Sequence, residues 1–359
     1  MNSMIIVTPS LDPKHNVSGI SSVAKFIIDN NKEYNYIPFI QGKKDNEKGG
    51  LHRITRLIKA YANWKSFLNQ HHGYLIHYNF PLDAKSVLRD YFFMRYARKK
   101  NFKMVAHVHG GLYMNKTDKP KIIEKMMRQI FTWNIQFIVL SEGEKDILRK
   151  QYNAHEVHVL PNCVDLTDAS TFDRKPSDKI DALYLGRIET NKGIDYILEA
   201  FTVLKNDGVE FTLHFAGKEN IGTNYVEKFS KELGDKFIYE GVVYGEQKNE
   251  LLRKCNVFVM PSFFEGLPMS LLECMSYSMV PVVTNVGSIC SVVKNGENGL
   301  FVKLKDVDSI VFSIKKLIKE KNFIDRLGNN AKDTIYNDFS PTSYISKLNL
   351  VYNELIINY

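Results

Sequence analysis

The sequence predicts an α/β protein built from two doubly wound domains with parallel sheets. Short segments rich in β-branched and aromatic residues alternate with longer segments of helical period, which is the pattern of βα units. These short segments form two groups of six, and a length of 359 residues suits two domains. A polar stretch at 165–179, rich in Asp, Ser, Thr and Pro, separates the two groups and predicts a linker.

Each expected strand is a short apolar run that ends at a turn or loop signal. The strands are expected at 4–8, 36–40, 75–78, 104–107, 137–140 and 157–160 in the first half, and at 182–185, 211–216, 237–239, 257–260, 281–284 and 299–302 in the second. A final helix is expected from Pro341 to about residue 356, because Ser340 supplies an N-cap hydroxyl and proline suits the first helical position. We expect an N-terminal domain at 1–163, onto which residues 340–359 pack back, and a C-terminal domain at 164–339.

Composition limits the function classes. Hydrophobic residues make up 44% of the chain and charged residues 25%, which excludes disordered and fibrous proteins. No apolar run approaches the roughly eighteen residues of a membrane span, and the start of the chain lacks the basic segment of a signal peptide, so a cytoplasmic protein is expected. The cysteines have no zinc-ligand spacing, and reduced, mostly buried thiols are expected at Cys163, Cys255, Cys274 and Cys290.

Positive charge is concentrated in the first half of the chain. Residues 1–163 carry 25 basic and 13 acidic side chains, a net charge of +12, whereas the remainder carries 23 and 27, a net charge of −4. An excess of this size predicts an anionic partner, which could be nucleic acid, a phospholipid surface or a phosphorylated substrate.

Two segments that follow expected strands of the second half carry candidate binding chemistry. The first, LGRIETNKG at 185–193, places Arg187 and Lys192 on one loop, where the two cations can clamp a diphosphate. The second, PSFFEGLPMSLLE at 261–273, places Glu265 on a loop and Glu273 on a helix that should begin near Pro268. The alternative interpretation is a set of ordinary solvated loop and helix charges.

The spacing of the two glutamates suits a shared general acid/base pair poorly. Helical and loop spacing allows their carboxylates to lie on the order of 10 Å apart. That separation suits the two ends of one nucleotide sugar. The amides at the start of the helix would add a positive dipole end that points at the strand ends.

The order of these motifs resembles family 4 of the retaining glycosyltransferases. The pattern is G-R-x4-K-G at Gly186, A-G at Ala216–Gly217 and E-x7-E at Glu265. Further matches cover nearly the whole chain: Ser18–Gly19, VAHVHG at 105–110, VLPN at 159–162 followed by Val164–Asp165, Phe339–Ser340 and Tyr352. The sequence departs from the family at Ser18, where a second glycine is common, and at Cys163, where glycine is usual.

The resemblance implies a GT-B fold of two facing Rossmann-like domains with a deep interdomain cleft, and it implies a role for each matching residue. Arg187 and Lys192 would bind the donor diphosphate, and Glu273 the ribose hydroxyls. Glu265 would hold the donor sugar hydroxyls, together with the backbone at Gly266, Leu267, Pro268, Met269 and Ser270. His109 would reach the donor sugar, and Gly19 would let the first loop approach the phosphates and the acceptor. Gly186 would contact the donor, and Gly217 with residues 242–244, centred on Val243, would flank the nucleobase.

The implied reaction is a retaining transfer of a hexose-type sugar from a nucleoside diphosphate donor, UDP-linked, to a lipid-linked or surface glycan acceptor in bacterial polysaccharide synthesis. The expected place is the cytoplasm, peripheral on the inner face of the membrane. No metal or cofactor and no nucleic acid are expected. The alternatives are a nucleotide-sugar epimerase or phosphorylase of the same fold, and a non-catalytic, membrane-bound partner of another transferase.

Three other features have competing interpretations. Asp306–Val307–Asp308 spells a metal-binding DxD but precedes a helical run and is better explained as an N-terminal cap. His107, inside an apolar strand, is expected to be a core histidine. The helical segment 85–100 mixes aromatic residues with cations, and with Lys116 it is a candidate membrane or acceptor surface through Arg95, Arg98, Lys99 and Lys100; the alternative is a core helix with a solvated basic face.

Overall fold

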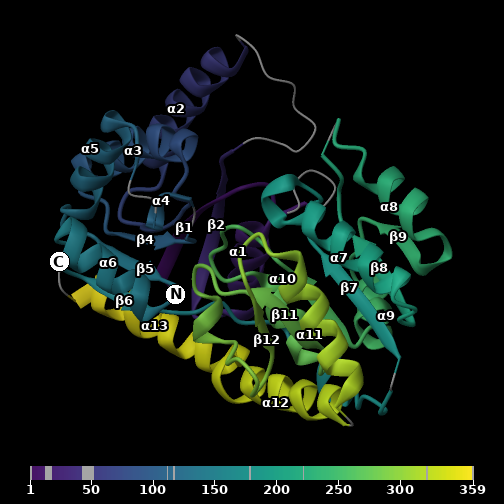
Figure 1. Ribbon diagram of the computed structural model, residues 1–359. Helices are drawn as coiled ribbons and strands as arrows, with labels where there is room; N and C mark the ends of the chain where they lie inside the picture. The colour runs from purple at the N-terminus through teal and green to yellow at the C-terminus, as the bar shows by residue number, and fades with distance from the viewer. Residues whose placement is uncertain are drawn as a thin grey trace. The chain divides into compact units, whose positions relative to one another are not determined.

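The computed structural model describes residues 2–12, 18–42, 52–110, 112–115, 118–177, 179–220, 222–320 and 322–357. The chain divides into two compact units, the first comprising Met1–Asn162 with Pro341–Tyr359 and the second Cys163–Ser340. Each unit is built around one six-stranded sheet in which all strands are parallel (Figure 1). The predicted α/β class with two parallel sheets is confirmed.

The first unit has the strand order β2-β1-β3-β4-β5-β6. Its strands are β1 (Asn2–Thr8), β2 (Tyr34–Ile40), β3 (Leu75–Phe80), β4 (Met104–Val108), β5 (Gln136–Val139) and β6 (Val157–Val159). Its helices are α1 (Gly19–Asn30), α2 (His52–Gln70), α3 (Ala84–Lys99), α4 (Leu112–Asn115), α5 (Lys121–Phe131), α6 (Glu142–Tyr152) and α13 (Pro341–Ile357). After β1 the chain continues to β2 on one side, and after β3 it continues to β4 on the other side. The neighbours β1 and β3 are therefore the switch point of this sheet.

Helices cover both faces of the first sheet. On one face α2, α3, α5 and α6 pack in series, and their apolar side chains join those of Ile76, Tyr78 and Phe80 from β3 in a single core. Because side chains alternate along a strand, His77 and Asn79 point to the opposite face. Helices α1 and α13 pack against each other there, and α13 also contacts β4 (Figure 1).

The second unit has the strand order β12-β11-β10-β7-β8-β9. Its strands are β7 (Ile180–Leu185), β8 (Phe211–Ala216), β9 (Phe237–Gly241), β10 (Val257–Met260), β11 (Val280–Thr284) and β12 (Leu300–Val302). Its helices are α7 (Ile194–Asn206), α8 (Tyr225–Leu233), α9 (Glu246–Lys254), α10 (Met269–Ser276), α11 (Val307–Lys319) and α12 (Phe323–Asp338). This is the Rossmann order, with the switch point between β7 and β10.

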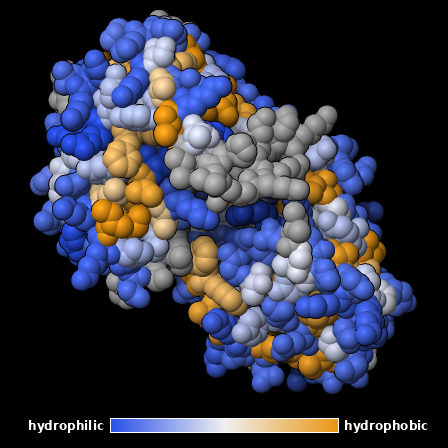
Figure 2. Space-filling model, turned by 90° about the horizontal axis from the view of Figure 1, so that it is seen from above, coloured by the Kyte–Doolittle hydropathy of each residue, from blue (hydrophilic) through white to orange (hydrophobic). Residues whose placement is uncertain are grey.

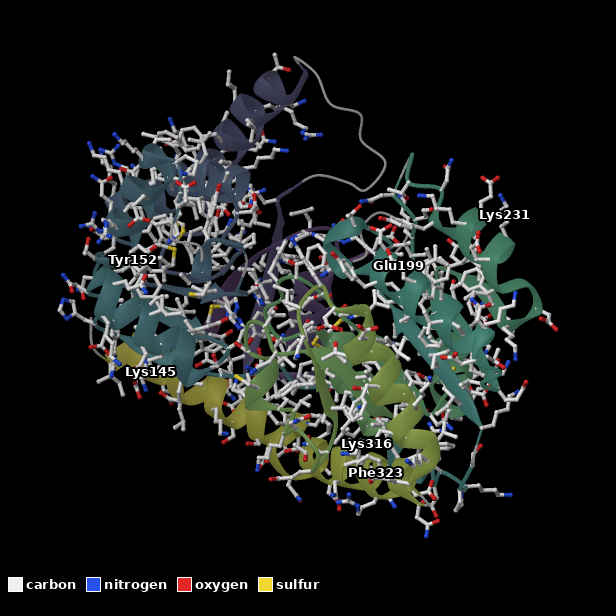
Figure 3. The ribbon with its side chains drawn as sticks, in the orientation of Figure 1. Lys145, Tyr152, Glu199, Lys231, Lys316 and Phe323 are labelled. Atoms are coloured by element: carbon white, nitrogen blue, oxygen red, sulfur yellow. The ribbon has the colours of Figure 1, made fainter. Side chains whose placement is uncertain are left out.

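The helices of the second unit pack against one another through specific contacts. Helix α11 packs against α7 and α12, and α10 packs against α12. The Lys316 ammonium of α11 lies 5.2 Å from the ring centroid of Phe323, which begins α12, and both side chains are labelled in Figure 3. Cys255 and Cys274 are buried free thiols, as is Cys163, whereas Cys290 is exposed, which agrees with the expected mostly buried thiols.

The segment 165–179, predicted to be a linker, makes specific contacts with the second unit. It contains a short 3₁₀ turn, η1 (Ala169–Thr171). The Arg174 guanidinium donates hydrogen bonds of 2.8–3.1 Å to the carbonyls of Leu252, Arg253 and Tyr277 at the ends of α9 and α10. A cation at the C-termini of two helices satisfies carbonyls that have no partner within the helix. The polar residues of this segment therefore attach it to the second unit.

The length and hydropathy of the helices decide whether any of them could span a membrane. Across the described parts of the chain, every helix is too short or too polar to cross a bilayer. Figure 2 shows one face on which hydrophilic residues predominate and hydrophobic residues form several separate patches.

Candidate functional site

The loops that follow β7 and β10 meet at the switch point of the second sheet, where ligands of open parallel sheets bind. Loop 186–193 follows β7 and loop 261–268 follows β10. The Phe263 amide donates to the Asn191 carbonyl at 2.9 Å, which joins the two loops through their backbones. The structure therefore brings the two motifs of the sequence together at one edge of one sheet.

Lys192 and Glu265 form an ion pair across these loops. Lys192 Nζ lies 2.6 Å from Glu265 Oε1, and only 16% and 11% of the two side chains are exposed. Arg187 is different, because about half of its side chain is exposed and its nearest carboxylate, on Glu189, lies 3.8 Å away. The Tyr184 hydroxyl donates to the Arg187 carbonyl and so fixes the backbone that carries this guanidinium. Two cations, one paired and one accessible, thus stand on the same loop.

Glu273 also has a cationic partner. Lys248 Nζ of α9 donates to Glu273 Oε1 of α10 at 2.9 Å, and both side chains are largely buried. Burial acts to lower the pKa of Lys248, but the Glu273 carboxylate outweighs it and the pKa is raised. Lys248 therefore stays protonated at physiological pH, and its hydrogen bond holds Glu273 in one orientation.

Helix α10 begins one residue later than the sequence predicted. Pro268 was expected as the first helical residue, but its ψ of 130° is extended, so it is the N-cap and the helix starts at Met269. In the preceding loop, the Gly266 carbonyl accepts from the Ser288 amide at 3.0 Å. Within the described residues, neither Pro268 nor Gly193, the N-cap of α7, contributes a capping side-chain hydrogen bond. Both helix N-termini are therefore suited to an anion.

Two glycines let the site loops pack backbone against backbone. A Cβ on Gly217, just after β8, would lie 1.8 Å from the Gly186 carbonyl oxygen, and one on Gly287 would lie 2.0 Å from that of Glu265. Both glycines have positive φ, so any side chain there is excluded by clash and by backbone strain. The Tyr239 hydroxyl donates to the Gly217 carbonyl at 3.0 Å, and Val243 lies half-buried just beyond β9.

The first unit places Gly19 and His109 at the carboxyl edge of its own sheet. Gly19 begins α1 directly after the cap residue Ser18, whose Oγ accepts from the Ser21 amide at 3.3 Å. His109 follows β4, and its Nε2 lies 2.6 Å from Asn79 Oδ1 at the end of β3. Burial, with a smaller contribution from His77, lowers the pKa of His109 to about 3, so its imidazole is neutral at physiological pH.

His107 is a core histidine, as the sequence predicted. It is fully buried, and its Nδ1 lies 3.3 Å from Nε2 of His77, whose Nδ1 in turn lies 2.7 Å from the Tyr352 hydroxyl on α13. Burial lowers the pKa of both His77 and His107, and neighbouring histidines lower that of His107 further.

Comparison with protein families and solved structures gives one consistent answer. Residues 168–334 match the family described as Glycosyl transferases group 1, and residues 31–168 match Glycosyltransferase Family 4. The chain belongs to glycosyltransferase family 4.

Two curated relatives show how far the sequence likeness of this glycosyltransferase extends. An uncharacterized glycosyltransferase of Methanocaldococcus jannaschii is 27% identical over 64% of the chain and 62% of its own length. The UDP-Gal:alpha-D-GlcNAc-diphosphoundecaprenol alpha-1,3-galactosyltransferase of Escherichia coli is 24% identical over 73% of the chain and 72% of its own length.

Solved glycosyltransferase structures share the GT-B fold. Sucrose-phosphate synthase from Thermosynechococcus elongatus matches with a TM-score of 0.80 at 18% identity, covering both chains completely. The Anabaena protein HepE, solved in complex with UDP-glucose, matches with a TM-score of 0.75 at 13% identity, covering 98% of this chain and 99% of that one.

Sequence reasoning missed three residues that contact the candidate site residues within each unit: Asn79 beside His109, Gly287 beside Glu265 and Lys248 beside Glu273. Asn79 was the easiest to find, because it is a polar residue at the end of a buried strand next to the strand that leads to His109. Gly287 lies three residues beyond the end of β11, whereas Gly186 and Gly217 directly follow β7 and β8, so its signal in the sequence is weaker. Lys248 carries no signal in the sequence, since its pairing with Glu273 depends on how α9 and α10 pack.

The acidic candidates resolve differently. Asp306 is the N-cap of α11, and its Oδ1 accepts from the Ser309 amide at 2.8 Å, as the cap interpretation predicted. One group of three possible metal ligands occurs among the described residues, formed by Glu156, His158 and Glu354 of the first unit. His158 Nε2 and Glu354 Oε2 lie 3.6 Å apart, and both glutamates are exposed, which is typical of a surface ion pair.

The basic residues at the end of the α3 region lie away from the carboxyl edge of the first sheet. Helix α3 follows β3, so it starts at that edge and runs about 24 Å to the opposite one. Arg95, Arg98, Lys99 and Lys100 are all exposed near or just beyond its end. This placement favours a lateral surface over an acceptor site. Lys116 lies outside the described residues.

Proposed function

We propose that this glycosyltransferase moves a hexose-type sugar, with retention, from a UDP-linked donor to a lipid-linked glycan in bacterial polysaccharide synthesis. The observation that carries the proposal is the cluster of anion-binding groups at the switch point of the second unit. Arg187, Lys192 and the N-termini of α7 and α10 meet at one sheet edge, beside Glu265 and Glu273. This arrangement suits a diphosphate flanked by two hydroxyl-rich groups.

The donor would replace contacts that the site already makes. A diphosphate at the loop of β7 attracts both Arg187 and Lys192, and Lys192 is then shared between phosphate and Glu265. Glu265 keeps an oxygen for sugar hydroxyls, while Glu273, held by Lys248, accepts hydrogen bonds from the ribose. Because these groups stand in place before binding, little reorganisation opposes the reaction.

The proposed chemistry proceeds on one face of the sugar. The bond from the anomeric carbon to the diphosphate oxygen breaks, and the acceptor oxygen forms a bond to the same face of that carbon. The acceptor hydroxyl proton passes to the departing phosphate oxygen, so atoms and charge balance without a protein nucleophile. Arg187, Lys192 and the amides at the start of α10 stabilise the charge that grows on the leaving diphosphate.

The acceptor proposal is supported by the relatives and by charge. The E. coli relative is named for a diphosphoundecaprenol-linked acceptor, as is a Campylobacter jejuni N-acetylgalactosaminyltransferase that is 24% identical over 62% of the chain and 62% of its own length. The proposed donor clamp lies in the half of the chain with net charge −4, so donor phosphates leave the +12 of residues 1–163 unexplained. A lipid diphosphate, or the anionic membrane that holds it, accounts for that excess.

A cationic aromatic face on α3 and α5 is the proposed membrane contact. The Tyr91 hydroxyl of α3 donates to Gln129 Oε1 of α5 at 2.6 Å. The Arg98 guanidinium lies 5.5 Å from the ring centroid of Trp133, two residues beyond α5, so α3 and the end of α5 present one surface. Apolar side chains are exposed on the same helices, at Leu88, Phe92 and Ile122, among the exposed cations. Aromatic and apolar groups mixed with cations suit the interface of an anionic bilayer.

A panel of nucleotide sugars incubated with the protein alone tests the proposal. We expect one UDP-sugar to be hydrolysed slowly, with the anomeric configuration of the released sugar retained. Release of an altered nucleotide sugar would establish the epimerase alternative. Absence of both binding and hydrolysis across UDP-, GDP- and ADP-sugars would support the non-catalytic alternative and overturn the proposal.

A further inference from the structure

Asn79 is held between two strands by opposite ends of its amide. Its Nδ2 donates to the Val7 carbonyl of β1 at 2.9 Å, and its Oδ1 lies 2.6 Å from His109 Nε2. The side chain is almost fully buried, with 4% of the residue exposed. Both contacts lie at the carboxyl edge of the first sheet, where β1 and β3 are neighbours.

The Val7 carbonyl determines which way the amide faces. A carbonyl oxygen only accepts hydrogen bonds, so it must meet the NH2 group of Asn79, and the amide oxygen must then face His109. An amide oxygen also only accepts, so His109 Nε2 must carry a hydrogen. A neutral imidazole carries one hydrogen, and His109 Nδ1 is therefore an unprotonated acceptor.

The surroundings of His109 oppose a second proton. The His109 ring stacks on the His107 ring with centroids 4.1 Å apart, and His107 contacts His77. A positive charge on His109 would lie against two further imidazoles in a largely buried setting, and no described side chain that faces this stack is an acid.

We propose that Asn79 is a positioning residue that fixes His109 as the Nε2–H tautomer and presents Nδ1 as a hydrogen-bond acceptor for a substrate hydroxyl. The hydroxyl must then act as the donor in this contact. A ligand with a deoxy or an alkoxy group at that position makes no such hydrogen bond. The identity of the hydroxyl as one of the donor sugar rests on the proposed function, whereas the tautomer does not.

Histidine ring NMR measures the tautomer directly. In protein labelled with 15N-histidine at pH 7.5, long-range proton–nitrogen correlations distinguish protonated from unprotonated ring nitrogens, and His109→Gln assigns the signal. We expect His109 Nε2 protonated and Nδ1 unprotonated. An Nδ1–H tautomer, or two protonated nitrogens, would overturn the proposal without reference to activity.

Two variants of Asn79 and one control extend the test. Asn79→Asp keeps an acceptor but adds a negative charge, so both nitrogens of His109 should become protonated. Asn79→Leu removes the constraint, and a mixture of tautomers should result, with kcat/KM reduced about tenfold to a hundredfold. Asn349→Leu removes another buried amide of the first unit, which accepts from Asn31, and should leave the His109 signal unchanged.

The kinetic result separates the inference from the proposed function. Donors lacking one hydroxyl at a time should show one position whose loss lowers kcat/KM in the wild type and has little further effect in Asn79→Leu. If His109→Ala transfers sugar at the wild-type rate, the role of His109 in the reaction fails, and the tautomer is still decided by the NMR spectrum. Should Asn79→Leu fail to fold, the wild-type spectrum alone decides.

Discussion

Lys192 Nζ lies 2.6 Å from Glu265 Oε1, and this ion pair joins the two loops at the switch point of the second unit. Each side chain is more than four-fifths buried, so each compensates a charge that water would otherwise have to solvate. The pair therefore serves two purposes. It holds the loops in place, and it keeps a cation at the position where the donor diphosphate is proposed to bind.

Removing the cation of this pair should abolish most of the turnover. Lys192→Ala should reduce kcat/KM by about 100-fold to 1,000-fold, because one electrostatic contact to the leaving group is lost. Arg187→Ala should have an effect of similar size. Lys231→Ala is the matched control, since Lys231 projects from α8 into solvent (Figure 3). Steady-state kinetics check the effect, and circular dichroism checks the fold. Wild-type activity in both site variants would refute the diphosphate clamp.

The double variant Lys192→Ala/Glu265→Gln tests whether the pair acts as a unit. Lys192→Ala leaves a largely buried carboxylate without its cation, so its melting temperature should fall, and neutralising Glu265 should restore part of that loss. Thermal unfolding of the four proteins in the cycle gives the coupling energy. Additive effects on the melting temperature would show that the pair does not stabilise the loops.

Lys248→Met should weaken nucleotide binding more than it slows chemistry. Lys248 orients Glu273, the proposed ribose contact, so its loss should raise the dissociation constant for UDP by about tenfold. Lys254→Met removes an exposed cation from the same helix and should change little. Calorimetric titration with UDP is the measurement. Equal affinities in the two variants would assign Lys248 a role in packing alone.

Gly287→Ala should disrupt the loop at 261–268 that carries Glu265, and Gly296→Ala should not. Both glycines have positive φ, but a Cβ on Gly287 would lie 2.0 Å from the Glu265 carbonyl oxygen, whereas no described atom lies within 4 Å of one on Gly296. The backbone penalty of about 1–2 kcal/mol is common to both, so the difference in unfolding free energy and in UDP affinity isolates the steric clash. Equal losses of stability and of UDP affinity in both variants would mean that the loop carrying Glu265 can shift to accommodate the added Cβ.

Acid should destabilise the first unit below about pH 6.5. His77 and His107 are fully buried and have lowered pKa values. Below the unfolded pKa, the unfolded chain therefore binds protons that the folded chain does not bind. Their stabilising contribution is complete above the unfolded pKa near 6.5, and below it each histidine removes up to about 1.4 kcal/mol per pH unit. Urea unfolding at pH 7.5 and pH 5.5 measures the loss. Histidine NMR at pH 5.5 should show both rings still neutral in the folded protein, and protonated rings there would contradict the prediction.

Neutralising the end of the cationic aromatic face should abolish binding to anionic vesicles. The variant in which Arg95, Arg98, Lys99 and Lys100 become glutamine loses roughly 1 kcal/mol of membrane attraction per residue. The control replaces four cations of the second unit, Lys205, Lys228, Lys231 and Lys236, with the same change in net charge. Co-sedimentation with phosphatidylserine vesicles, and with phosphatidylcholine vesicles for comparison, is the assay. Unchanged binding would return this face to a solvated helix surface.

Where strands lie was largely predictable from the sequence. All twelve expected strands are present, and β8 and β10 have the expected bounds because they are mostly apolar and are followed directly by Gly217 and Pro261. The expected end of β3 was two residues early. Polar Asn79 resembles the start of a loop, yet its hydrogen bond to Val7 keeps it within the strand, which continues to Phe80.

The site was predictable only in part, for a different physical reason. Motif spacing placed Arg187, Lys192 and Glu265 at strand ends, because a parallel sheet gathers the ends of its strands at one edge. The partner of Glu273 could not be foreseen, since Lys248 reaches it from α9, and no local pattern encodes which side chains meet when two helices pack.

The position of α13 has a consequence for synthesis on the ribosome. Tyr352 bonds His77, Asn349 accepts from Asn31, and the carbonyl of Ile356 accepts from Lys103, so the last helix completes the core of the unit that is translated first. The second unit can close its sheet once residue 302 has emerged. The first must wait until residue 357 has emerged, and the part of its sheet face that α13 covers stays exposed until then. The first unit is therefore the part of the chain that depends on protection while the polypeptide grows.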